Sequence, residues 1–158
     1  SPERINKIIH DSRLGTYGVV ALIFGLLTRL GLLLSLVEYG YSLLSILSVG
    51  FASGKLAIIF SRNFFNSSRF AKMGSIVGII SQKNLFLATL IWALPTLVIF
   101  PFYGILLGLS LMAFIISTIG LKSEKALGGI TGDILGAMAF LTELVFLFGI
   151  IIITVTIN

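Results

Sequence analysis

The residues of this 158-residue chain that could carry out chemistry fall into two short segments. The first, residues 10–18, reads HDSRLGTYG, and the second, residues 128–133, reads GGITGD. A carboxylate can bind a divalent cation, a guanidinium can bind phosphate oxygens, and glycines let the backbone approach a ligand closely. Both segments therefore indicate a site for a phosphorylated ligand and a metal ion. For the first, an alternative is a helix cap at the membrane interface, with Arg13 reaching the headgroups.

The second segment opens an apolar run, so N–H groups and the positive end of a helix dipole would face a phosphate there. Its glycine spacing is not that of a Walker loop, and no lysine follows the last glycine. The alternative is that Thr131 or Asp133 caps the helix beside a stripe of packing glycines. That stripe consists of Gly128, Gly132 and Gly136. Gly50 with Gly54 and Gly104 with Gly108 have the same four-residue spacing, which predicts helix packing.

Three charged side chains lie inside apolar runs, where charges are costly and often functional. Arg29 follows Tyr17 by twelve residues, and Glu143 follows Ile130 by thirteen. At about 1.5 Å per residue, both lie roughly 18–20 Å from the same end of their helices. We hypothesise a buried Arg29–Glu143 ion pair that joins the two helices and does no chemistry. Lys55 lies near the end of its run, where its ammonium can extend to the interface.

Other common catalytic sites are excluded by residue counts. His10 is the only histidine, and its adjacency to an aspartate and a serine does not make a catalytic triad, which is a spatial arrangement. The chain has no cysteine, which excludes disulfides, thiolate metal sites and cysteine nucleophiles. Residues 61–83 are basic with interleaved aromatic residues, which predicts an interfacial segment or a surface for an anionic substrate.

The elements that position these residues must be membrane helices. Hydrophobic residues make up 57% of the chain and charged residues 11%, whereas soluble domains carry about 25% charged residues. So few charges cannot cover a soluble protein of this size. The composition excludes a soluble enzyme, a nucleic-acid-binding protein and a disordered chain. We predict an all-α fold, a polytopic bundle of about five transmembrane helices that forms a single domain over residues 1–158.

The apolar runs are long enough for five spans, since a span takes about 20 residues. They cover residues 17–37, 41–60, 85–121 (two helices) and 130–157. Pro101 and Gly104 mark the break within the third run, because proline removes a backbone donor. The segments before the first span, after the second span and after the fourth span hold most of the Lys and Arg residues, whereas the opposite connections hold none. The positive-inside rule therefore predicts that the basic face is cytoplasmic.

The two segments resemble the signature of the cobalamin synthase family, the adenosylcobinamide-GDP ribazoletransferases. Residues 10–18 are similar to its D-S-R-x-G-x-[FY]-G segment, and residues 1–4 to the polar lead-in of that segment. Residues 128–137, followed by Glu143, are similar to G-G-x-T-G-D-x-L-G-A…E. The motifs come in the family's order, each at the start of a membrane helix, and the resemblance extends over essentially the whole chain.

The resemblance implies a phosphotransferase in the cell (inner) membrane with a cytoplasmic active face. Such an enzyme joins adenosylcobinamide-GDP to α-ribazole or its 5′-phosphate, releases GMP and uses Mg²⁺. Asp11 and Asp133 are implied as the catalytic metal ligands. The residues expected to contact substrate are Ser12, Arg13, Arg62, Arg69, Lys72, Gly129, Thr131 and Gly132.

One family feature is absent, an upstream aspartate-rich segment of the form D-G-x-x-D-x-x-D-G. We therefore expect a C-terminal fragment, inactive alone, whose partner is the missing N-terminal segment of the same enzyme. Two other functions stay open: a lipid-directed CDP-alcohol-type phosphotransferase, and a small transporter subunit. Binding of a GDP-capped corrinoid would distinguish the ribazoletransferase from the lipid-directed enzyme. The position of the polar residues at helix ends argues against the transporter. The oligomeric state, including a homo-oligomer, is open, and no nucleic-acid partner is expected.

Overall fold

The computed structural model describes residues 1–9, 15–71 and 80–158, and these residues form six helices. Five of the six are long and apolar enough to cross a membrane. The helices are α1 (Pro2–Ile9), α2 (Thr16–Glu38), α3 (Leu43–Phe64), α4 (Gln82–Ile99), α5 (Phe102–Leu127) and α6 (Gly132–Ile157). The predicted all-α bundle with five spans is confirmed, including the break at Pro101. The short polar helix α1 was not predicted.

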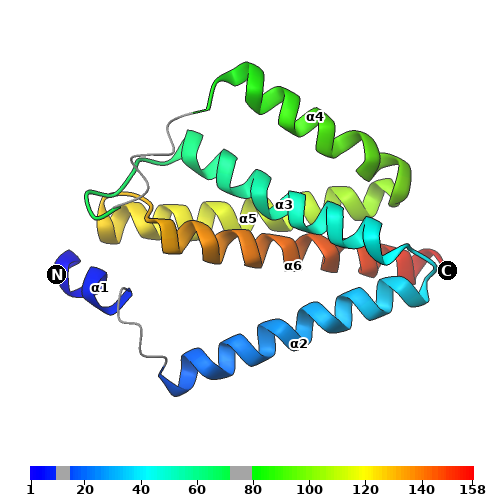
Figure 1. The fold of residues 1–158 in the computed structure, drawn as a ribbon, viewed down its shortest axis with the longest axis horizontal. Coiled ribbons are helices and arrows are strands. Elements are labelled where there is room, and N and C mark those ends of the chain that lie inside the picture. The colour runs from blue at the N-terminus through cyan, green and yellow to red at the C-terminus, as the bar shows by residue number, and fades with distance from the viewer. Residues whose placement is uncertain (10–14, 72–79) are drawn as a thin grey trace.

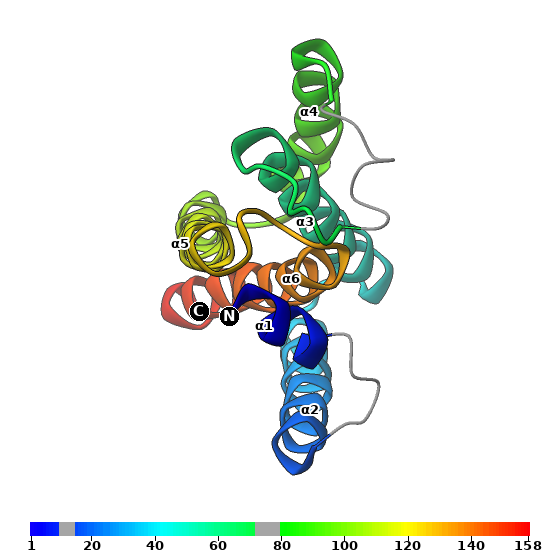
Figure 2. The same cartoon turned by 90° about the vertical axis from the view of Figure 1, so that its left-hand side faces the viewer.

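The helix that carries the GGITGD segment is the central one. Figure 2 shows α3, α5 and α6 grouped together, with α2 and α4 on opposite flanks. Of the most apolar 18-residue window of α6, 50% is buried, compared with 11% for both α2 and α4. The outer faces of α2 and α4 are apolar and exposed, as expected for helices whose surroundings are lipid.

All of the basic loops lie at one end of the bundle. Here α2, α4 and α6 begin, α3 and α5 end, and α1 lies beside them (Figure 1). We call this the basic end, and its described Arg and Lys residues are Arg4, Arg62, Arg69, Lys83, Lys122 and Lys125. The turns at the opposite end, residues 39–42 and 100–101, contain no Lys or Arg. The charge asymmetry that the sequence predicts is therefore present in the fold.

Two of the three glycine sets pack helices together as predicted. A methyl group at Gly54 of α3 would lie 2.6 Å from the Ala139 carbonyl oxygen of α6. One at Gly108 of α5 would lie 2.7 Å from the Phe146 ring. The third set behaves differently, because a methyl group at Gly128, Gly132 or Gly136 would meet no neighbouring atom of the described residues within 4 Å. The interpretation of this set as a packing stripe is therefore wrong.

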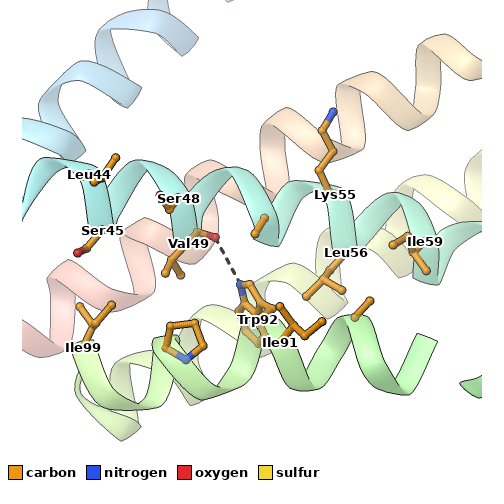
Figure 3. Close-up of a pocket in the computed structure, with 13 residues that line it drawn as sticks. Leu44, Ser45, Ser48, Val49, Lys55, Leu56, Ile59, Ile91, Trp92 and Ile99 are labelled. Atoms are coloured by element: carbon orange, nitrogen blue, oxygen red, sulfur yellow. Dashed lines mark hydrogen bonds between the residues drawn. The ribbon is translucent and has the colours of Figure 1, made fainter. Parts of the chain in front are cut away.

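Helix α4 is attached to α3 through its tryptophan. The Trp92 indole N–H donates to the Ser53 hydroxyl at 3.1 Å. It also approaches the Val49 carbonyl oxygen at 3.4 Å (Figure 3). Its ring also packs edge-on against Phe146 of α6, with ring centroids 5.4 Å apart. Trp92 therefore links the outer helix α4 to both α3 and the central helix α6.

Candidate active site at the basic end

The GGITGD segment is held against the loop that follows α3. The Ile130 N–H donates to the Asn66 carbonyl oxygen at 2.8 Å, and the Ser68 N–H donates to the Ile130 carbonyl oxygen at 3.1 Å. These bonds form a parallel β-bridge between Ser67 and Ile130. The backbone and side-chain amides of Asn66 also donate to the Glu124 carboxylate, at 3.2 and 3.3 Å. Two loops about sixty residues apart thus form one unit, which no side-chain pattern in the sequence signals.

Serine hydroxyls strengthen the junction of these loops. Ser68 donates to the Leu127 carbonyl oxygen at 2.8 Å, and Ser123 donates to the Gly129 carbonyl oxygen at 2.7 Å. Both serines are buried, so each of these bonds satisfies backbone oxygens that water does not reach. The loop conformation is therefore fixed by the end of α5 and by the chain that follows α3.

Gly129 is required by this junction. Its φ is +152°, and a methyl group there would lie 2.5 Å from both the Asn66 carbonyl oxygen and the Ser68 nitrogen. Only glycine permits so close an approach of two backbones together with this conformation. Gly128 before it has φ +69° and ends α5 in the left-handed conformation that is common after helices. Gly129 therefore allows the two loops to dock, and its expected contact with substrate stays a prediction.

Thr131 occupies the cap position of α6, but its side chain makes no capping hydrogen bond. Thr131 is 1% exposed, and its hydroxyl oxygen has no hydrogen-bond partner among the described residues. The alternative that Asp133 caps the helix is wrong, because Asp133 lies in the first turn, where the helix dipole favours a carboxylate. Gly132 and Asp133 are exposed. A buried hydroxyl and an exposed carboxylate therefore lie together at the start of α6.

Arg62 lies in a helix, not in the expected loop. The α3 helix continues to Phe64, and the Ser61 hydroxyl donates back to the Ala57 carbonyl oxygen at 2.6 Å, which makes this serine compatible with a buried helix. Arg62 is 8% exposed and donates to the Ser67 hydroxyl at 2.5 Å. The expectation that the loop begins at residue 61 is therefore wrong for residues 61–64, which belong to α3, and Arg62 supports the bridge loop.

Arg69 is exposed and lies beside the GGITGD segment. It lines a cavity of about 430 Å³ together with Ser67 and Gly128. Its guanidinium forms an ion pair with Glu3 of α1 and lies 4.8 Å from the Phe70 ring centroid. The pKa of Glu3 is lowered, chiefly by the hydrogen bond from its backbone N–H and further by the charge of Arg69. Arg69 is therefore a cation that faces a cavity at the basic end.

Several predicted site residues lie outside the described residues: Asp11, Ser12, Arg13 and Lys72. Within residues 1–9, 15–71 and 80–158, no group of three or more His, Cys, Asp or Glu residues gathers. Mg²⁺ in proteins is commonly held by one or two carboxylates together with substrate phosphates. Asp133 fits the role of one such carboxylate, but the described residues do not form a complete metal site.

The ion pair that the sequence predicts deep in the bundle is present. The Arg29 Nε donates to Glu143 Oε1 at 2.8 Å, and its Nη2 lies 2.6 Å from the same oxygen. Glu143 is buried, and the Arg29 guanidinium lies 5.7 Å from the Phe51 ring centroid. The pair joins α2 to α6, so these two charges are satisfied by each other.

Comparison with known proteins agrees with the resemblance found in the sequence. Residues 1–151 match the cobalamin-5-phosphate synthase family. An adenosylcobinamide-GDP ribazoletransferase of Clostridium botulinum (strain Okra / Type B1) is 36% identical over 153 residues, which cover 92% of this chain and 58% of that protein. A protein of the same name from Azorhizobium caulinodans is 34% identical over 157 residues, which cover 92% of this chain and 57% of that protein.

This chain therefore spans less than two thirds of the length of these relatives. No solved structure matches it. The family match covers nearly the whole chain, including the GGITGD segment and Glu143. The chain belongs to the cobalamin-5-phosphate synthase family.

Proposed function

We propose that this chain supplies the substrate-facing end of an adenosylcobinamide-GDP ribazoletransferase. The reaction joins adenosylcobinamide-GDP to α-ribazole or its 5′-phosphate and releases GMP. The observation that carries the proposal is the bridge between residues 66–68 and 130, which joins the residue just before the start of α6 to the loop that Arg62 contacts and that carries Arg69. The names of the relatives support the choice of substrates. By the positive-inside rule, this end faces the cytoplasm.

In this proposal the substrate pyrophosphate lies at the start of α6. The N–H groups of Gly132 and Asp133 and the helix dipole neutralise its charge. Arg69 contacts the phosphates from the side of the cavity, together with Ser12, Arg13 and Lys72. Arg62 is a positioning residue, because it donates to the loop serine Ser67.

The chemical step is a substitution at phosphorus. A hydroxyl oxygen of α-ribazole or of α-ribazole 5′-phosphate attacks the phosphorus attached to the cobinamide, and the hydroxyl proton is released to solvent. The bond from that phosphorus to the bridging oxygen breaks, and GMP leaves with the bridging oxygen and its electron pair. Phosphoryl transfer of this kind is accelerated mainly by positioning and by neutralising charge. The two-loop junction provides the positioning, since it fixes Thr131 and the first turn of α6.

We include Mg²⁺ in the proposal as a charge-neutralising ion for the pyrophosphate oxygens. Asp133 and Asp11 are the residues of this chain that would hold it. One or two carboxylates with substrate oxygens and water are a common donor set for this ion. The proposal therefore predicts that metal affinity depends on Asp133 and on the presence of the phosphorylated substrate.

The test is ribazole transfer to adenosylcobinamide-GDP by the full-length enzyme in membranes. Wild type and Asp133→Asn are compared over a range of Mg²⁺ concentrations. We expect Asp133→Asn to lower the rate about 100-fold or more, because a charged ligand at the reacting phosphates is lost. Inserted protein is quantified in each membrane preparation, so that loss of activity is not confused with loss of protein.

Glu38→Gln is the matched control, because Glu38 is an exposed carboxylate at the opposite end of the bundle. It should retain wild-type transfer at every Mg²⁺ concentration. Wild-type activity on a lipid alcohol with none on the corrinoid would replace the proposal with the lipid-directed alternative. Full activity of Asp133→Asn would remove the start of α6 from the chemistry.

A further inference from the structure

A second polar cavity lies between α2, α3 and α6, deeper in the bundle than the candidate active site. Its volume is about 280 Å³. Its wall contains the charged side chains of Arg29, Lys55 and Glu143 and the aromatic side chains of Phe51 and Phe140. Lys55 and Phe51 are exposed and Arg29 is partly exposed, so the cavity opens to the surface of the bundle at the level of the apolar spans, where charges are costly. The cavity therefore needs an account beyond helix packing.

Lys55 is the unbalanced charge in this cavity. It forms no hydrogen bond or ion pair with any residue that the structure describes, and its ammonium lies 5.5 Å from the Phe51 ring centroid. The α3 helix continues for nine residues after Lys55, so this residue lies about 13 Å from the end of the helix, deeper than the apolar run suggests. Figure 3 shows its side chain extending away from Trp92 and α4. The ammonium is therefore placed at the cavity.

The other two charges of the cavity neutralise each other. Arg29 binds Glu143 at 2.6 Å, so the carboxylate is already matched by one cation. The cavity thus carries one net positive charge, which belongs to Lys55. An anion that enters it would gain a charge-assisted hydrogen bond, and such bonds are stronger than neutral ones.

The cavity lies along the same face of α6 as Asp133 of the candidate active site. Gly136 lines the cavity, and it follows Asp133 by three residues, so the two lie on the same face of α6. A methyl group at Gly136 would meet no atom within 4 Å, so space is open beside this glycine. A ligand with one phosphate at the start of α6 can therefore extend a second anionic group along this face toward Lys55.

We propose that this cavity binds a phosphate-bearing group, with Lys55 as the cation that contacts it. The phosphate has two chemical sources, a soluble phosphorylated substrate or the phosphodiester of a membrane lipid. Only the first source rests on the proposed function. In both cases the aromatic rings of Phe51 and Phe140 form an apolar wall for the remainder of the ligand.

The test measures the unfolding midpoint of the full-length protein, purified in a phosphate-free maltoside detergent. The probes are α-ribazole 5′-phosphate and phosphatidylglycerol, each titrated separately. A ligand that binds only the folded state raises the midpoint, and the titration gives its apparent affinity. We expect at least one probe to raise the wild-type midpoint. Its apparent affinity should fall about tenfold to a hundredfold in Lys55→Met and be largely retained in Lys55→Arg.

The matched control is Lys122→Met, which removes a lysine from the exposed surface of α5 and should bind like wild type. Gly136→Leu fills the open space and should abolish the rise, whereas Gly136→Ala should reduce it less. A rise with only one of the probes identifies the source of the phosphate. Equal affinities in wild type and Lys55→Met, or no rise with either probe, would overturn the inference. Transfer is assayed separately, so an inactive wild type contradicts the proposed function while the lipid titration still tests the cavity.

Discussion

Two acidic residues of α6, Glu143 and Asp133, differ in their burial and in the roles that we assign to them. Glu143 lies deep in the bundle, is buried and is bound by Arg29 of α2. Asp133 lies in the first turn, is exposed and follows a buried threonine whose hydroxyl has no hydrogen-bond partner among the described residues. A buried charge that is paired between two helices contributes to structure, whereas an exposed carboxylate in the first turn of a helix lies where a ligand can reach it.

The two regions are also held by different forces. The interior depends on close helix packing and on one ion pair between α2 and α6. The basic end depends on backbone hydrogen bonds between the loops at residues 66–68 and 128–131. Substitutions in the interior should therefore change stability most, and substitutions at the basic end should change transfer most. The predictions below test this division, from the largest expected effect to the smallest.

The largest effect is expected for Glu143→Gln. It leaves the Arg29 guanidinium without its carboxylate, and removing one partner of a buried pair costs about 3 kcal/mol or more. Thermal unfolding in detergent measures the loss. The double swap Arg29→Glu with Glu143→Arg should recover most of the stability that either single swap loses. A double swap no better than the single ones would mean that the pair does not hold the helices together.

A smaller but local effect is expected for Gly129→Ala. The methyl group would collide with the backbone at Asn66 and Ser68, and the conformation is strained for alanine, at a cost of about 1–3 kcal/mol. Because the loops then separate, transfer should fall more than stability does. The control is Gly40→Ala, which has φ +89° but open space around it at the opposite end. Equal losses of transfer in both variants would contradict a role for the loop junction.

Thr131→Val tests whether the Thr131 hydroxyl contributes to the stability of the fold or to substrate binding. Replacing a buried hydroxyl that has no described partner by a methyl group of the same shape should leave the free energy of unfolding unchanged, or raise it by about 1 kcal/mol. If the hydroxyl contacts substrate, transfer falls about tenfold, and Thr131→Ser restores it. Unfolding and transfer are measured on the same preparations. A destabilised Val variant would show that the hydroxyl is bonded within the fold.

The smallest effect is expected for Glu3→Gln. The pKa of Glu3 is lowered from its ordinary value of 4.5, chiefly by its backbone N–H and further by Arg69, so the contact is present above that value. It is lost only as the pH falls through the lower pKa of the folded state. Because both side chains are exposed, unfolding midpoints of variant and wild type should coincide at pH 7 and at pH 5. A clear difference at pH 7 would mean that α1 is part of the cooperative fold.

The spans and the ion pair could be predicted because both leave strong signals in the chain. Long apolar runs have few structural solutions in a membrane, and the depth of Arg29 matches that of Glu143 by residue spacing alone. The junction of the two loops could not be predicted in this way. The bonds between Ile130 and residues 66–68 join backbone atoms, which every residue has, so no residue type marks them.

Arg62 and one set of glycines show where pattern reasoning stops. Arg62 has the composition of a loop around it, but it lies in the last turn of α3 and is buried. The spacing of Gly128, Gly132 and Gly136 equals that of packing glycines, yet these positions meet no other helix. Spacing identifies residues on a shared helix face, but only the tertiary arrangement decides what that face contacts.

The most direct test of this account compares Asp133→Asn and Glu143→Gln in one experiment. Unfolding in detergent and ribazole transfer in membranes are measured for both variants of the full-length enzyme, each corrected for inserted protein. We predict that Asp133→Asn loses transfer and lowers the unfolding midpoint less than Glu143→Gln does, and that the remaining folded protein of Glu143→Gln still transfers ribazole. Loss of transfer with unchanged stability in Glu143→Gln, or loss of stability with unchanged transfer in Asp133→Asn, would contradict the division between the two ends of this helix.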